Sequence, residues 1–217
     1  MENSTMLPVH LNDAISAACN RVNQRGVSEL HQLMNWTGTA QLGVIDMGKI
    51  NSMCIPMNWT ASEEYGHDPD VQVFHPQSSP DCQLVVFCRD EKITEQSALR
   101  FSRLLAKPSH QLSSDVLPLL GEVIRDKASK TAFVLTRAAT ENINGKQVLT
   151  VEGFYPESAI TVKHMFFEAE KTGTLMQEIL FQAPSSKFRE HFNGAKQAIN
   201  SINWKIEQLW HEPLLEN

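Results

Sequence analysis

The order of patterns in the second half of the chain restricts its fold more than any other feature. Four runs rich in apolar and β-branched residues follow one another, at residues 131–138, 147–154, 161–168 and 175–182. Short polar stretches separate them, and the first contains Asn144-Gly145, a strong signal for a tight hairpin turn. Strands joined by such short turns pair with their neighbours in opposite directions. The pattern therefore predicts an antiparallel meander.

An amphipathic helix is predicted directly after the last of these strands. Its apolar residues recur at helical spacing and are Phe188, Phe192, Ala195, Ile199 and Ile202. Pro184 is placed for the first turn, and Ser185 and Ser186 are placed to cap it. A sheet with one apolar face needs a covering layer. We therefore expect this helix to return across the meander.

The first half of the chain predicts further strands and two helices. A hairpin is expected over residues 37–59 with its turn near Met47-Gly48. Residues 71–75 and 82–90 read as strands, the second with an apolar centre that is typical of an inner strand. Helices are expected at two ranges, residues 94–106 and 113–126.

These patterns divide the chain into three parts. Residues 1–37 form an N-terminal helical extension, residues 38–204 form the main domain, and residues 205–217 form an amphipathic tail. The expected fold class is α+β, built on an antiparallel β-sheet.

Charge and composition exclude several classes of function. The chain of 217 residues has a net charge of −6, which argues against general nucleic-acid binding because that needs a basic face. No apolar run is long enough to insert into a membrane, and the N-terminus lacks the pattern of a signal peptide. We therefore expect a cytoplasmic protein.

The cysteines support a reducing location. Cys82 and Cys88 lie in one expected strand about 20 Å long, so they cannot bridge each other within it. Cys19 and Cys54 are isolated in the sequence, and the absence of a Cys-x-x-Cys pair argues against a zinc ribbon. We expect reduced thiols, no structural disulfide and no cofactor.

Three stretches within residues 38–204 carry a resemblance to a known fold. They are Ile55-Pro56-Met57-Asn58-Trp59, the meander with Asn144-Gly145-Lys146, and the close from Phe181-Gln182-Ala183-Pro184 through Phe188 to Ala198-Ile199-Asn200-Ser201-Ile202-Asn203-Trp204. Together they resemble the PsbP-like fold, which is shared with Mog-type Ran-binding proteins and with small bacterial chaperones of secreted toxins. The resemblance implies an antiparallel sheet with helices on both faces, in an α/β/α sandwich. It also implies binding rather than catalysis.

One group of side chains has the types needed for chemistry. If Glu152 pairs with His164 and His164 pairs with Glu178 across three neighbouring strands, the three lie in a row about 5 Å apart. A carboxylate–imidazole–carboxylate row can bind a metal ion or move a proton. The alternative is a row of polar side chains that pair with one another on a solvated face. We favour that alternative, so no catalytic or metal site is assigned.

Both ends of the chain carry apolar stripes outside the resemblance. Ile15 and Val22 lie in the N-terminal extension, and Leu209 and Trp210 lie in the tail. Either stripe can fold back onto the domain. Otherwise it can anchor a partner, since exposed apolar patches of this kind mark docking sites.

The function that fits these features is a non-enzymatic adaptor or chaperone that binds another protein, as an accessory factor in bacterial protein secretion. Ile15, Val22, Leu209 and Trp210 are the expected contacts, in a homo- or hetero-oligomer. Two alternatives stay open. One is an enzyme or metal-dependent protein that uses the Glu152/His164/Glu178 row, and the other is an inhibitor or immunity-type protein.

Overall fold

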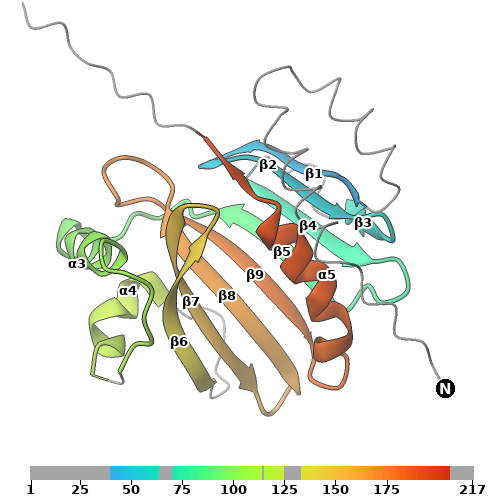
Figure 1. Cartoon of the computed structure of the whole chain (residues 1–217). Helices are drawn as coiled ribbons and strands as arrows, with labels where there is room; N and C mark the ends of the chain where they lie inside the picture. The colour runs from blue at the N-terminus through green and yellow to red at the C-terminus, as the bar shows by residue number, and fades with distance from the viewer. Residues whose placement is uncertain (1–39, 64–69, 114, 125–132, 206–217) are drawn as a thin grey trace, which may run out of the picture.

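A computed structural model describes residues 40–63, 70–113, 115–124 and 133–205 (Figure 1). The described strands are β1 (Ala40–Met47), β2 (Ile50–Pro56), β3 (Trp59–Ala61), β4 (Val71–Pro76), β5 (Gln83–Cys88), β6 (Val134–Ile143), β7 (Lys146–Tyr155), β8 (Ile160–Glu168), β9 (Met176–Pro184) and β10 (Asn203–Trp204). The described helices are α3 (Glu95–Leu105), the 3₁₀ helix η2 (Leu117–Leu120), α4 (Gly121–Ile124) and α5 (Phe188–Asn200).

The described strands form two sheets in which all neighbours run antiparallel. The larger sheet has the order β3-β4-β5-β9-β8-β7-β6, and the smaller one has the order β1-β2-β10. The meander from β6 to β9 and the inner position of β5 confirm the sequence predictions. A mixed α/β fold built on antiparallel sheets is therefore correct, but the strands do not all join one sheet.

Helix α5 covers one face of the larger sheet, as predicted. Ala195 and Ile199 are buried in one core with Phe181 of β9. Phe188 and Phe192 are only partly buried, and their rings lie 5.1 Å and 5.9 Å from the ring of Phe181 between centroids. The helix thus buries the apolar face of the meander.

The start of α5 differs from the sequence prediction. Pro184 ends β9, and α5 begins four residues later at Phe188 with Lys187 at its N-cap. The expected cap residue Ser185 instead donates its backbone N–H to the carbonyl of Ala159 at 2.7 Å, and its hydroxyl lies 2.8 Å from that of Thr161. Ser185, which the local pattern assigned to the helix, is therefore bonded to the start of β8 instead.

The opposite face of the larger sheet carries a second core. Phe101 of α3 is buried with Leu149 of β7 and Phe166 of β8. Helix α3 begins as expected, since Thr94 accepts the backbone N–H of Ser97 with its hydroxyl oxygen. In the described part of the helix expected over residues 113–126, the structure has the 3₁₀ turn η2 followed by α4, with Pro118 in the first turn of η2, where its missing N–H is tolerated.

The turn of the β1–β2 hairpin is anchored to the larger sheet by one buried side chain. Gln177 of β9 donates from its amide nitrogen to the carbonyl of Met47 at 3.0 Å, and its side-chain oxygen accepts the N–H of Lys49 at 2.7 Å. Gly48 between them has φ +51°, and a Cβ there would lie 2.3 Å from the Gln177 oxygen. The close approach therefore requires glycine.

The cysteine prediction is correct at two positions and wrong at a third. Cys82 and Cys88 are free, and burial raises the pKa of Cys82 to about 11. Cys54 is disulfide-bonded, with its partner outside the described residues. The spacing argument excluded only a bond between two cysteines of the same strand. It could not detect a bond between Cys54 and a distant segment.

Two sets of expectations lie beyond what can be compared with the structure. The N-terminal helical extension and the amphipathic tail, apart from Lys205, fall outside the described residues. No helix in the described ranges is long and apolar enough to cross a membrane.

Candidate functional site

The structure separates the three residues of the expected polar row. Glu152 pairs with Lys163 rather than with His164, which pairs with Val151. Glu152 therefore lies on one face of the sheet and His164 on the other, because a register shift of one residue reverses the face. Glu178 pairs with Phe166 and so shares a face with His164. The expected row is therefore wrong at Glu152, and the expected pairing of His164 with Glu178 is wrong as well, because His164 pairs with Leu180.

His164 and Glu178 belong to a cluster held by Arg89. The Arg89 Nε donates to Oε1 of Glu178, whose side chain is only 3% exposed. The His164 Nε2 lies 2.5 Å from the other carboxylate oxygen but is not aligned for a hydrogen bond. The imidazole packs on Phe166 with 4.1 Å between ring centroids. One oxygen of the Glu178 carboxylate is thus bonded to Arg89, and the other lies beside the imidazole of His164.

Arg89 also connects this cluster to α4. Its Nη1 donates to the carbonyl of Glu122 at 2.9 Å, and its Nη2 donates to that of Val123 at 2.5 Å. Both carbonyls belong to the main chain of α4. Among the described residues, no group of three potential ligands is placed to hold a metal ion. The cluster therefore joins a helix to the sheet.

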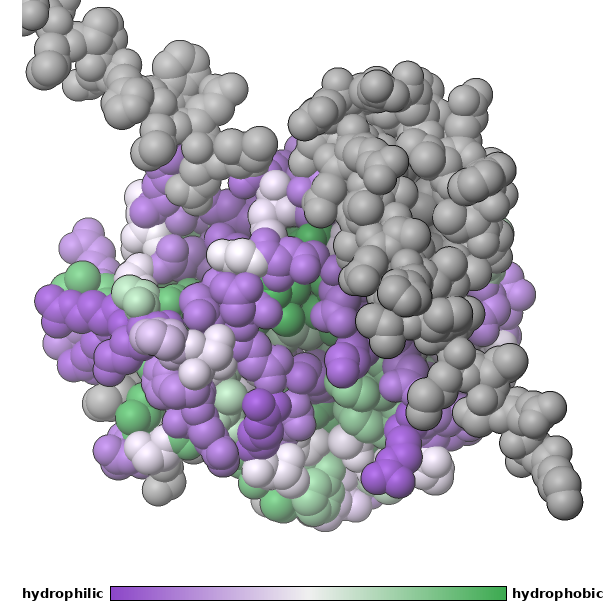
Figure 2. Space-filling model, viewed as in Figure 1, coloured by the Kyte–Doolittle hydropathy of each residue, from purple (hydrophilic) through white to green (hydrophobic). Residues whose placement is uncertain are grey.

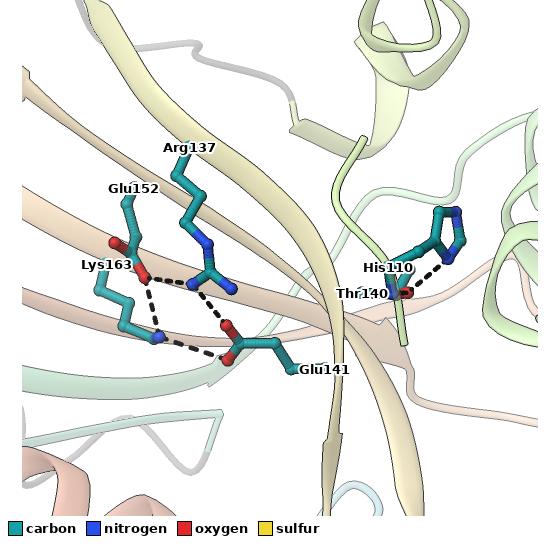
Figure 3. Close-up of polar contacts among 6 residues, drawn as sticks. All are labelled: His110, Arg137, Thr140, Glu141, Glu152 and Lys163. Atoms are coloured by element: carbon teal, nitrogen blue, oxygen red, sulfur yellow. Dashed lines mark hydrogen bonds and ion pairs between the residues drawn. The ribbon is translucent and has the colours of Figure 1, made fainter. Parts of the chain in front are cut away.

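Glu152 belongs instead to a charged quartet with Arg137, Glu141 and Lys163 (Figure 3). Arg137 donates to Glu141 at 2.7 Å and to Glu152 at 3.1 Å, and Lys163 reaches the same two carboxylates at 3.3 Å and 2.9 Å. Two cations thus face two carboxylates. The quartet fits the solvated polar row that the sequence left as the alternative.

The quartet shifts the titration of one of its members. Burial opposes ionisation of Glu141, but Lys163 and Arg137 outweigh it and hold the pKa of Glu141 below its usual value. Lys163 also lies over the ring of Phe192, with its Nζ 5.7 Å from the centroid, and so ties the quartet to α5. The arrangement stabilises the sheet without leaving a carboxylate free for a ligand.

Strand β6 forms one edge of the larger sheet, and its second half is covered. Residues 110–112 run antiparallel to it: Thr140 donates its N–H to the carbonyl of His110, and Leu112 donates to that of Ala138, both at 2.8 Å. The N–H of His110 also donates to the hydroxyl of Thr140 at 3.1 Å (Figure 3). This part of the strand therefore has a neighbour on each side.

The first half of β6 is open by contrast. All side chains from Val134 to Arg137 are exposed, and within the described ranges no strand pairs with the outer side of this stretch. We name residues Val134–Thr136 the open edge. Its unpaired backbone groups can accept an added strand.

The open edge is apolar. Val134 and Leu135 are 39% and 38% exposed, and Phe133 lies against Tyr155 with 5.0 Å between ring centroids. Figure 2 shows apolar atoms at the lower end of the molecule, where Figure 1 places the start of β6 and the end of β7. The sequence predicted a strand here but held no signal that it would be an edge.

The partner contacts expected from the sequence cannot be compared with this edge. Ile15, Val22, Leu209 and Trp210 all lie outside the described residues. They stay predictions.

Comparisons with known proteins show the fold alone. No family model matches the chain, and no curated protein does. A solution structure of PsbP (CyanoP) from Synechocystis sp. PCC 6803 covers 77% of this chain and 94% of its own length, at 11% identity and a TM-score of 0.45. A crystal structure of LpqN, involved in cell envelope biogenesis of Mycobacterium tuberculosis, covers 77% and 92%, at 14% identity and a TM-score of 0.46. Both likenesses are weak and concern the fold only.

Proposed function

We propose that this chain is a non-enzymatic protein-binding module that receives an extended segment of its partner along the open edge of β6. The observation that supports this is the pair of exposed apolar side chains, Val134 and Leu135, on an edge strand whose outer side has no described neighbour at these residues. Adding a strand to an exposed edge is a recurring mode of peptide recognition.

Backbone pairing and side-chain contacts have separate roles in this proposal. The outer N–H and C=O groups of the open edge supply hydrogen bonds that are independent of the partner's sequence. Val134, Leu135 and Phe133 supply the apolar contacts that discriminate between partners. The segment at residues 110–112 already pairs in this way with the second half of β6. A partner strand would pair with β6 beside residues 110–112, along the same edge.

The charged groups near the open edge support binding over catalysis. Arg137 is the residue next to the edge, and its bonds to Glu141 and Glu152 raise its pKa, with the Glu141 bond the largest cause. It is therefore committed to the quartet. A role as adaptor or chaperone, in protein secretion or elsewhere, stays part of this proposal. A cytoplasmic location also stays a proposal, but the cysteines no longer support it, because Cys54 is disulfide-bonded.

Site-specific photo-crosslinking tests the proposal. A benzophenone side chain replaces Leu135 in the full chain, and a matched one replaces Leu99, which is 53% exposed on α3. We expect one partner to crosslink at residue 135 in native cells and not at residue 99. Leu135→Lys should abolish capture of that partner by the full chain, whereas Leu99→Lys should retain it. Equal crosslinking at both positions, or capture that survives Leu135→Lys, would contradict the proposal.

A second candidate function follows from the pair that the structure does bring together. Arg89 holds Glu178, and Glu178 lies against the imidazole of His164, an arrangement that can orient a general base. If this pair is catalytic, His164→Gln should remove a turnover activity while the melting temperature and partner capture stay unchanged. If the pair is structural, the same change should alter stability alone.

A further inference from the structure

The outward face of α3 is both basic and apolar. Its buried face contains Phe101 and Leu104, while Leu99 on the other side is 53% exposed. Arg100 and Arg103 are exposed on the same side of the helix, and Lys107 is exposed just beyond its C-terminal end. We name Leu99, Arg100, Arg103 and Lys107 the basic face.

Nothing within the described residues neutralises the basic face. No described carboxylate forms an ion pair with Arg100, Arg103 or Lys107. Arg100 and Arg103 are three residues apart, and Arg103 and Lys107 are four apart, spacings at which like charges repel on a helix. The helix dipole favours only the cations near the C-terminal end. The chain as a whole has a net charge of −6, so an acidic segment packed on this face would relieve the repulsion between its cations.

The tail has the complementary composition. Residues 206–217 contain Glu207, Glu212 and Glu216 and no lysine or arginine. Leu209 and Trp210 lie between the first two glutamates. The segment therefore offers an apolar centre with acidic residues on either side. It matches a surface on which cations surround one exposed leucine.

A chain of contacts places the start of the tail near the start of α3. Lys205 donates its N–H to the carbonyl of Lys49 at 2.9 Å, and Lys49 bonds to the side chain of Gln177. Gln177 pairs with Cys88, the last residue of β5, and the chain then enters α3 at Glu95. The tail therefore leaves the domain beside the strand that leads into this helix.

The tail is long enough to cover the basic face. Twelve residues in extended form reach about 40 Å, and a helix of α3's length measures about 16 Å. The surplus allows the segment to cross from the end of β10 to the far end of α3. Neither end of α3 is therefore out of reach.

We propose that residues 206–217 dock on the basic face of α3 in the same chain, with Leu209 and Trp210 against Leu99 and the glutamates beside Arg100, Arg103 and Lys107. This contact is independent of the open edge of β6. It gives the tail an intramolecular role, in place of the partner contact that its sequence also allowed.

Hydrogen–deuterium exchange of the full-length protein tests the contact. The variant Arg100→Glu/Arg103→Glu reverses the basic face, and Arg189→Glu/Lys196→Glu makes the same charge change on the exposed side of α5. We expect peptides from residues 206–217 to exchange at least about ten-fold more slowly than an unstructured peptide, an easily resolved protection. The α3 variant should lose that protection, and the α5 variant should keep it.

Charge exchange and dilution complete the test. Adding Glu207→Lys/Glu212→Lys to the α3 variant should restore the protection, which also shows that the variant is folded. Protection that persists in the α3 variant, or exchange of the native tail at the unstructured rate, overturns the proposal. Protection that falls on dilution overturns it as well, because the tail would then dock on a second copy.

Discussion

Replacing Arg89 with methionine tests how the sheet and α4 are joined. The guanidinium contacts Glu178 and the carbonyls of Glu122 and Val123, so the change removes all of these bonds at once. Methionine keeps much of the side-chain volume and removes the charge. The carboxylate of Glu178, with a side chain 3% exposed, then stays buried without its cation.

The expected cost follows from that buried carboxylate. Breaking one partner out of a buried ion pair typically costs about 3–5 kcal/mol, because an uncompensated charge remains. His164 still lies against Glu178, which places the expectation in the lower half of this range. The second variant, Arg89→Met/Glu178→Met, removes both charges, and such paired replacements are often close to neutral. We therefore expect the double variant to be more stable than Arg89→Met.

Urea unfolding followed by circular dichroism measures both variants, with Lys187→Met as the matched control. Lys187 pairs with Asp81 at the surface, with side chains 42% and 45% exposed, so its replacement should leave the urea midpoint close to that of the native protein. A cost below about 1 kcal/mol for Arg89→Met would show that the cluster does not join α4 to the sheet. A double variant less stable than Arg89→Met would show that the unpaired carboxylate of Glu178 does not destabilise the fold.

Four further outcomes are expected. Phe192→Ala should lower the free energy of unfolding by about 2 kcal/mol, below the range for a fully buried ring because Phe192 is only partly covered, and urea titration would show no loss if α5 did not cover the sheet. Gly48→Ala should destabilise the fold by at least about 1 kcal/mol through its positive φ and the contact with Gln177, and an unchanged midpoint would contradict that close approach. The depressed pKa of Glu141 gives stability that is present above its usual value of 4.5 and is lost as the pH falls through the lower folded value, so melting temperatures of Glu141→Gln should vary less with pH in that window than those of the native protein. Alkylation of the denatured, unreduced protein should label Cys82 and Cys88, and reduction should add further label; an unchanged mass would contradict a disulfide at Cys54.

Local patterns were sufficient for most elements of the main domain, although not for the helix expected over residues 113–126 or for the start of α5. The alternation of apolar residues and the Asn144-Gly145 turn specified the β6–β9 meander, because short turns restrict which strands can pair. The spacing of Phe188, Phe192 and Ala195 specified α5 and its cover of the sheet, since a helical stripe must bury its apolar side. Thr94 marked the start of α3 through its side-chain cap.

The candidate sites depended on long-range pairing that no local pattern contains. The register between β7 and β8 placed Glu152 with Lys163 and away from His164, and one residue decides the face. The position of β6 at the end of the sheet made Val134 and Leu135 exposed, although their sequence reads as that of any strand. The sequence by itself determined the elements and their order, because these follow from periodicity and turn chemistry. Only the tertiary structure decided which faces and edges stay open, because those depend on contacts between segments far apart in the chain.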